Sequence, residues 1–323
     1  MKKSNWLFMI MLILSTMITV SSNSWISMWI GLELNMMSFI PIILYKMNKS
    51  SSEAAMTYFL IQSISSMLML MFIIVMMMNM KFMMNIITIC MLIKMGAAPF
   101  HSWLPEILSK MSWMKCNTMM TWQKIAPLMM ISNTSNNITI MNASIILSVI
   151  IGSMGGLNQV SLRKMMGYSS INHLGWMLAI NKTMNLWTIY LLIYSVLMTF
   201  MCYKLMYYKL YFLNQINNLN MNNTEKISMF IMMLSLGGLP PLIGFLPKWI
   251  AIQSLINNQE YILLIIMIMS SLITLMFYMR IMTSMYLSFG STIKWSKISK
   301  TKMFTFMMLS FNFLLPLIMI MDL

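Results

Sequence analysis

Charged residues are scarce in this chain of 323 residues, and their scarcity argues against a soluble protein. Asp, Glu, Lys and Arg together make up 8% of the chain, whereas soluble domains are usually about a quarter charged. Hydrophobic residues make up 59%, in apolar runs that are continuous rather than alternating, which disfavours a membrane β-barrel. The longest polar stretch, residues 214–228, is too short for a soluble domain. The composition therefore predicts an all-α polytopic membrane protein.

Cysteine and histidine are also rare. Cys90, Cys116 and Cys202 are scattered, without the paired spacing of a metal or redox site. No phosphate loop, dinucleotide fingerprint or nucleophile triad is present. The only histidines, His101 and His173, could relay protons because histidine titrates near neutral pH. They could ligate a haem only from facing helices at matching depth. The sequence therefore predicts no metal site and no cofactor site.

Basic residues outnumber acidic ones by 21 to 6, which gives a net charge of +15. A basic protein could bind nucleic acid, but these residues occur in short segments between apolar runs, where they encode membrane topology. We therefore expect no nucleic-acid partner and about eleven transmembrane helices. The expected spans are 5–21, 25–45, 55–78, 82–109, 117–132, 138–159, 167–180, 186–208, 227–257, 261–287 and 303–321.

Eleven crossings place nearly all basic residues on one face of the membrane, and only Lys81 and Lys182 on the other. This asymmetry predicts that the N-terminus lies on the positive side and the C-terminus on the opposite side. Lys2 and Lys3 with the first apolar run also resemble a signal peptide, but the equally apolar remainder favours a first spanning helix. The expected positive face holds Lys2, Lys3, Lys46, Lys49, Lys110, Lys115, Arg163, Lys164, Lys204, Lys209, Lys226, Arg280, Lys294, Lys297, Lys300 and Lys302.

Four charged residues fall inside the expected spans: Glu33, Lys94, Lys124 and Lys248. A charge in hydrocarbon costs about 2.5–3.5 kcal/mol on insertion scales, so membrane proteins keep such residues mainly where ions or protons move. At 1.5 Å per residue, Glu33 and Lys94 each lie about 20 Å from a membrane face, near the midplane. They are on different helices at similar depth, so they can pair. These four residues are the candidate functional site.

Glycine and proline interrupt the two long spans that carry Lys94 and Lys248. Lys94 is followed by Gly96 and Pro99, and Lys248 is preceded by Gly238 and Pro240 among other breakers. Broken helices are tolerated at mid-membrane only where they are buried in protein or meet water. Two such helices in corresponding positions indicate an inverted repeat with a site at the breaks. We expect one transmembrane domain, 1–323, with repeat halves of roughly 25–159 and 167–287.

Some of these charged residues and glycines also have purely structural interpretations. Lys248 could reach a membrane face as a helix-end residue, and Glu33 could serve as a structural partner for a neighbouring subunit. Glu53 and Lys110 are interpreted as charges in interfacial loops. The cluster of Gly152, Gly155 and Gly156 is typical of small-residue helix packing.

Five segments resemble the NADH–ubiquinone oxidoreductase chain 2 family, the antiporter-like membrane-arm subunits of mitochondrial respiratory complex I. The match is colinear from about residue 25 to about residue 250, and the tail beyond residue 260 matches only in hydrophobicity. The segments are Trp29–Asn35, Lys94–Glu106, Thr121–Leu128, Gly155–Trp176 and Leu236–Trp249.

The resemblance implies a role for each buried charge. Glu33 and Lys94 would form a modulating ion pair, Lys124 would be the central proton carrier, and Lys248 the carrier towards the exit. The family has eleven helices in animals, and its positive face is the mitochondrial matrix. Multi-pass insertion in the inner membrane would then place the N-terminus in the matrix and the C-terminus towards the intermembrane space.

The resemblance also implies which components lie outside this chain. NADH, FMN, iron–sulfur clusters and ubiquinone would be handled by partner subunits, and this chain would couple their electron transfer to proton pumping. Expected partners are the membrane-arm subunits 4 and 4L, supernumerary subunits and inner-membrane lipids, with a bound phospholipid such as cardiolipin. The alternatives are a free-standing cation/proton antiporter, which would exchange ions in liposomes, and a non-transporting structural subunit, which would tolerate loss of all four charges.

Overall fold

The computed structural model describes residues 2–45, 48–78, 83–134, 138–181, 186–217, 223–287 and 302–314. Within these ranges regular structure is helical, apart from one isolated antiparallel bridge between Ser161 and Phe212. The predicted all-α class is therefore confirmed. By length and composition, five helices are able to cross a membrane: Trp25–Leu44, Lys49–Met77, Thr139–Leu157, Leu186–Tyr207 and Tyr261–Met285.

The chain divides into two compact units, Met1–Ser148 and Val149–Leu323, and the boundary falls inside helix α8 (Ile138–Leu157). The expected inverted repeat within a single domain stays a prediction. The first unit contains α1 (Lys2–Ser21), α2 (Trp25–Leu44), α3 (Lys49–Met77), α4 (Met83–Met95), α5 (Trp103–Lys110), α6 (Trp113–Met120), the 3-10 helix η1 (Trp122–Lys124) and α7 (Ile125–Asn133).

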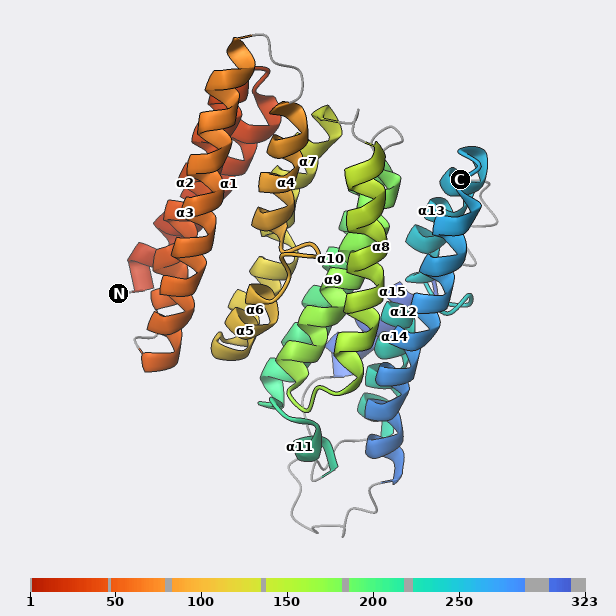
Figure 1. Cartoon of the computed structure of the whole chain (residues 1–323). Helices are drawn as coiled ribbons and strands as arrows, with labels where there is room; N and C mark the ends of the chain where they lie inside the picture. The colour runs from red at the N-terminus through yellow and green to blue at the C-terminus, as the bar shows by residue number, and fades with distance from the viewer. Residues whose placement is uncertain are drawn as a thin grey trace. The chain divides into compact units, whose positions relative to one another are not determined.

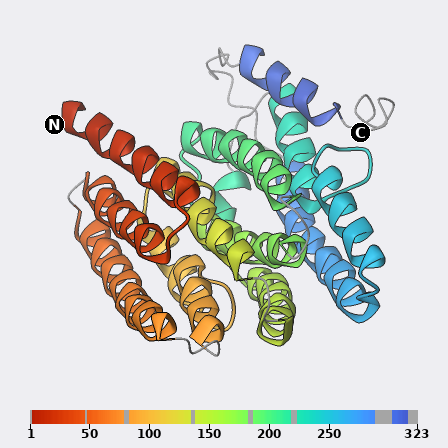
Figure 2. The same ribbon diagram turned by 90° about the horizontal axis from the view of Figure 1, so that it is seen from above.

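Helices α1, α2 and α3 lie side by side in the first unit (Figures 1 and 2). Gly31 of α2 permits the close approach of α1, because a Cβ atom there would lie 2.4 Å from Cγ2 of Thr19. Ser24 caps α2, and its Oγ accepts a hydrogen bond from the backbone N–H of Ser27 at 3.3 Å. The N-terminal segment thus forms a helix that packs along α2. This agrees with its interpretation as a first spanning helix.

The second unit contains the remaining helices. They are α9 (Leu162–Ile180), α10 (Leu186–Tyr207), α11 (Leu213–Asn217), α12 (Asn223–Gly237), α13 (Phe245–Asn257), α14 (Tyr261–Leu287) and α15 (Lys302–Asn312). Helices α10, α14 and α15 all pack against α12, and α9 packs against α10 and α13.

The glycine cluster near the end of α8 is a packing surface, as predicted. A Cβ atom at Gly152 would lie 2.6 Å from the backbone nitrogen of Asn172, so only glycine permits this approach of α9. A Cβ atom at Gly156 would meet the ring of Phe277 on α14 at 2.8 Å. The glycines at the end of α8 therefore allow α9 and α14 to pack closely against it.

Every expected span contains helical residues, and both long spans are broken as predicted: one into α4 and α5, the other into α12 and α13. The span expected at 117–132 is also broken, because η1 separates α6 from α7. The short span expected at 167–180 begins earlier, at Leu162. Lys81, Lys182 and residues 315–321 of the last expected span lie outside the described residues.

Two cations expected on the positive face are buried in helices. Lys115 of α6 donates from Nζ to the carbonyl oxygen of Ile43 at 2.7 Å, in the last turn of α2. Lys204 of α10, inside the expected span 186–208, donates to Oγ of Ser228 on α12 and interacts electrostatically with Glu225. Both side chains find acceptors on neighbouring helices, and the membrane face on which they lie stays a prediction.

Candidate functional site

Lys94 lies in the last turn of α4, directly before the break. The helix ends in a Schellman motif, in which Gly96 has φ +70 and the N–H of Ala97 donates to the carbonyl oxygen of Leu92 at 3.0 Å. The side-chain amide of Gln62 on α3 donates to the backbone oxygen of Lys94 at 3.0 Å. At the break, the backbone N–H and carbonyl groups around Lys94 therefore have hydrogen-bond partners, while the lysine itself is only 6% exposed.

Glu33 of α2 lies within electrostatic range of Lys94 and of Tyr58 on α3. Its Oε1 is buried and accepts no hydrogen bond from the described residues. Within the described residues, Glu33 and Lys94 do not approach to the 4.0 Å between nitrogen and oxygen that defines an ion pair, whereas Lys110 and Glu53 do. The two charges are neighbours across a gap rather than a closed pair.

Lys124 ends η1, the 3-10 segment between α6 and α7. Its side chain is 2% exposed. Pro127 follows in the first turn of α7, where its missing N–H costs nothing. A short 3-10 segment within a helical span often marks a functional hinge. The lysine predicted as the central carrier therefore lies at a third break, which we did not predict.

One cavity in the first unit touches both Lys94 and Lys124. Its volume is about 20 Å³, room for about one water molecule. The polar side chains that line it besides the two lysines are Asn35, Tyr58, Gln62 and Gln123. A cavity with several polar partners and room for one water molecule can hold that water. The cavity therefore provides a polar contact region shared by two buried amines.

Lys248 lies in the first turn of α13 in the second unit, facing the break that ends α12. Its Nζ donates to the carbonyl oxygen of Gly237 at 2.7 Å, so the ammonium caps the carbonyl end of α12. The ring of Trp176 on α9 has its centroid 5.7 Å from Nζ. Gly238 has φ +78, and the N–H groups at 238 and 239 close a second Schellman motif.

The two histidines occupy different settings. His101 follows the break after α4, and its Nδ1 lies 3.1 Å from the carbonyl oxygen of Pro99. His173 is buried in α9, with Nδ1 2.8 Å from the hydroxyl of Tyr190. The ring of Tyr194 lies against that of His173, with centroids 4.7 Å apart. His173 and Trp176 are three residues apart on α9, so their side chains leave that helix on the same side.

The structure brings some of the predicted site residues together. Glu33, Lys94 and Lys124 belong to the first unit, and two of them share the cavity. Lys248 and His173 belong to the second unit. Asn35, Tyr58, Gln62 and Gln123 were missed, although polar residues within apolar runs were the signal that could have indicated them.

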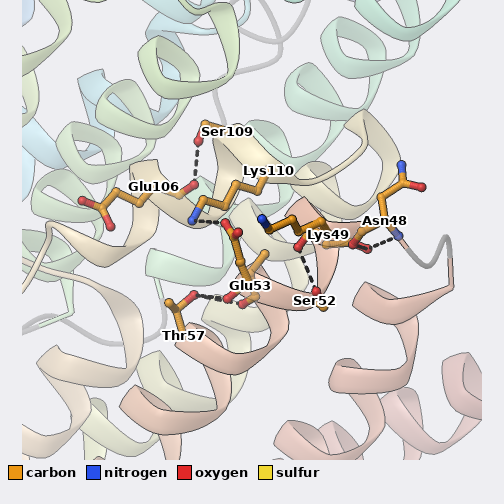
Figure 3. A network of polar contacts seen from close by, with 10 residues as sticks. Asn48, Lys49, Ser52, Glu53, Thr57, Glu106, Ser109 and Lys110 are labelled. Atoms are coloured by element: carbon orange, nitrogen blue, oxygen red, sulfur yellow. Dashed lines mark hydrogen bonds and ion pairs between the residues drawn. The ribbon is translucent and has the colours of Figure 1, made fainter.

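Glu53 and Lys110 are helical residues rather than loop charges. Nζ of Lys110 at the end of α5 lies 3.1 Å from Oε2 of Glu53 in α3 (Figure 3). Their side chains are 34% and 49% exposed, so the pair contributes only about 0–1 kcal/mol. The pair ties the two helices weakly and makes Lys110 a suitable control position.

Comparisons with known proteins agree with each other. The family described as NADH:quinone oxidoreductase/Mrp antiporter, TM, matches residues 22–85 and 77–274. NADH-ubiquinone oxidoreductase chain 2 of Aedes aegypti is 49% identical over 299 residues, covering 89% of this chain and 87% of the relative. The protein of that name from Anopheles gambiae is 45% identical over 300 residues, with 89% and 87% covered.

A chain in the structure of respiratory complex I from Thermus thermophilus shares the fold. The TM-score is 0.84 at 19% sequence identity, covering 97% of this chain and 79% of that chain. The residues matched to the family include Glu33, Lys94, Lys124 and Lys248.

Proposed function

This chain belongs to the NADH–ubiquinone oxidoreductase chain 2 family, and we propose that Lys124 and Lys248 carry protons through it under the control of the Glu33–Lys94 pair. It is a membrane protein and a subunit of an H⁺-translocating NADH:ubiquinone reductase of the respiratory chain. The single observation that carries the proposal is the small polar cavity, of about 20 Å³, that touches both Lys94 and Lys124 within an apolar helical unit.

The proposed path begins on the positive face. A proton reaches Lys124 through water, passes to Lys248 and leaves on the opposite side. Lys248 is held at the carbonyl end of α12, which stabilises its charged form, so it can receive a proton and must release it against that interaction. The break motifs supply this arrangement, since an unbroken helix would offer no carbonyl oxygen there.

Glu33 is proposed to act as the switch. A pair of charges 4 Å apart is worth about 4 kcal/mol at an effective dielectric constant of 20. Glu33 and Lys94 are farther apart than an ion pair, so their interaction is weaker than that bound. Moving one charge against 100 mV costs about 2.3 kcal/mol. Closing this gap to an ion pair would strengthen the interaction to at most about 4 kcal/mol, a bound that exceeds the cost of moving one proton against 100 mV.

The location and partners follow as part of the proposal. We place the chain in the inner mitochondrial membrane because of its family, with its N-terminus in the matrix and its C-terminus towards the intermembrane space, because the expected eleven crossings put most basic residues on one face. NADH, FMN, iron–sulfur clusters and ubiquinone are assigned to other subunits, because the sequence has no matching motif. Subunits 4 and 4L, supernumerary subunits and a phospholipid such as cardiolipin are the proposed neighbours. His101 and His173 are proposed relays.

Lys94→Met tests the proposal at the switch. The variant keeps the length and apolar stem of lysine but cannot bind a proton, so we expect fewer protons pumped per NADH oxidised in vesicles that carry the assembled complex. Lys110→Ala is the matched control, because it removes a lysine of the same unit whose ion pair is largely exposed. Equal pumping by wild type, Lys94→Met and Lys110→Ala, with intact assembly, would support the non-transporting alternative instead.

A further inference from the structure

A chain of three polar side chains lies on the wall of the cavity between Lys94 and Lys124. The hydroxyl of Tyr58 on α3 donates to Oε1 of Gln123 in η1, with 3.4 Å between the oxygens. Nε2 of Gln123 donates in turn to Oδ1 of Asn35 on α2 at 3.0 Å. All three line the cavity, so the chain connects α2, α3 and η1 there. None of the three has a role in the path proposed above.

Packing fixes the position of Tyr58. The residue is 2% exposed. Its ring lies edge-on to that of Phe39, with centroids 5.2 Å apart, and 6.4 Å from that of Trp103. An aromatic ring held on two sides leaves the hydroxyl little freedom except rotation of its O–H bond. The hydroxyl is therefore a fixed donor on the cavity wall.

Glu33 interacts electrostatically with Tyr58 at one end of the chain, and Asn35 at the other end follows Glu33 by two residues on α2. Gln123, the middle member of the chain, immediately precedes Lys124 in the 3-10 segment. Gln123 uses both halves of its amide, one as acceptor and one as donor, so its orientation is determined by Tyr58 and Asn35.

We propose that Tyr58 and Asn35 are positioning residues, which hold Gln123 and thereby couple the state of the Glu33–Lys94 centre to the placement of Lys124. This inference rests on the proposed function. A shift of charge at Glu33 changes the field on the Tyr58 hydroxyl, and the hydroxyl acts on Lys124 through its hydrogen bond to Gln123. Since η1 is a single 3-10 turn between two helices, a change at Gln123 reaches the backbone of Lys124 directly.

Tyr58→Phe is the first test, because it removes only the hydroxyl and leaves the ring between Phe39 and Trp103. In vesicles carrying the assembled complex, we expect the rate of NADH-driven proton pumping to fall by about twofold, the scale for loss of one long hydrogen bond at the low end of the usual range. The KM for NADH and the NADH oxidation rate with an uncoupler present should not change. Tyr45→Phe is the matched control in the same unit, at a tyrosine that is 39% exposed.

A double-mutant cycle separates positioning from general packing. If the hydroxyl acts through Gln123, Gln123→Met alone and Tyr58→Phe with Gln123→Met should pump equally slowly. Additive losses in the cycle, or a Tyr58→Phe complex that pumps like Tyr45→Phe, would overturn the inference. Gln123→Met also keeps the test decisive where Tyr58→Phe assembles poorly, because normal pumping by Gln123→Met contradicts the proposal by itself.

Lys94→Met in the same experiment separates this inference from the proposed function. Reduced pumping by Lys94→Met together with normal pumping by Tyr58→Phe would leave the proton path standing and reject only the positioning chain. Normal pumping by Lys94→Met would reject the path itself.

Discussion

Gly238→Ala is expected to reduce proton pumping severalfold per assembled complex, although it adds a single methyl group. A Cβ atom at Gly238 would lie 2.7 Å from Cδ and 2.8 Å from Nζ of Lys248, so the side chain must move. The residue has φ +78, a conformation that costs a non-glycine residue about 1–2 kcal/mol. Displaced, the ammonium loses its hydrogen bond to the carbonyl oxygen of Gly237.

The neighbouring glycine provides a matched control for this prediction. Gly237 ends α12, and a Cβ atom there would meet only Leu275, at an ordinary distance of 3.6 Å. Gly237→Ala should therefore pump like wild type. Pumping and the amount of assembled complex are measured for both variants. Equal pumping by the two variants would show that the position of the Lys248 ammonium does not matter.

Lys204→Met is expected to have the largest effect on stability. Lys204 is 3% exposed and Glu225 is 5% exposed, and the lysine joins α10 to the first turns of α12. Removing the ammonium takes away the hydrogen bond to Oγ of Ser228 and the favourable charge near Glu225. The loss of one hydrogen bond to a charged group costs about 1.5–3 kcal/mol. Since α12 also packs against α14 and α15, the loss extends through the second unit.

The expected result is a much lower yield of assembled complex and a lower temperature of inactivation. Lys204→Met combined with Glu225→Gln should recover part of that loss, because no buried carboxylate is then left behind. A single Lys204→Met variant that assembles and survives heating like wild type would contradict the role of this contact.

The sequence predicted the helical class and two of the three breaks, because hydropathy and Gly/Pro content report directly on membrane helices. The third break, at Lys124, was missed since Pro127 falls in the first turn of a helix, where proline is compatible with continuation. The buried positions of Lys115 and Lys204 were missed for a different reason. Whether a lysine near a span end meets water or a carbonyl oxygen depends on the neighbouring helix.

The four charges of the candidate site could be identified from the sequence because each is costly in hydrocarbon. The neutral polar residues that line the cavity could not be identified in this way. Asn35, Gln62 and Gln123 are neutral, and neutral polar residues in a span serve helix packing as often as function. Only their convergence on one cavity with Tyr58 distinguishes them, and that convergence requires three helices to be placed.

The most direct test of the central claim is the number of protons pumped per NADH oxidised by complex that carries Lys124→Ala in this chain. Lys124 lines the cavity and is nearly fully buried, and alanine can neither hold nor pass a proton. We predict normal assembly with lost or reduced pumping. An unchanged number of protons per NADH in fully assembled complex would contradict the account, because the buried charges would then be structural.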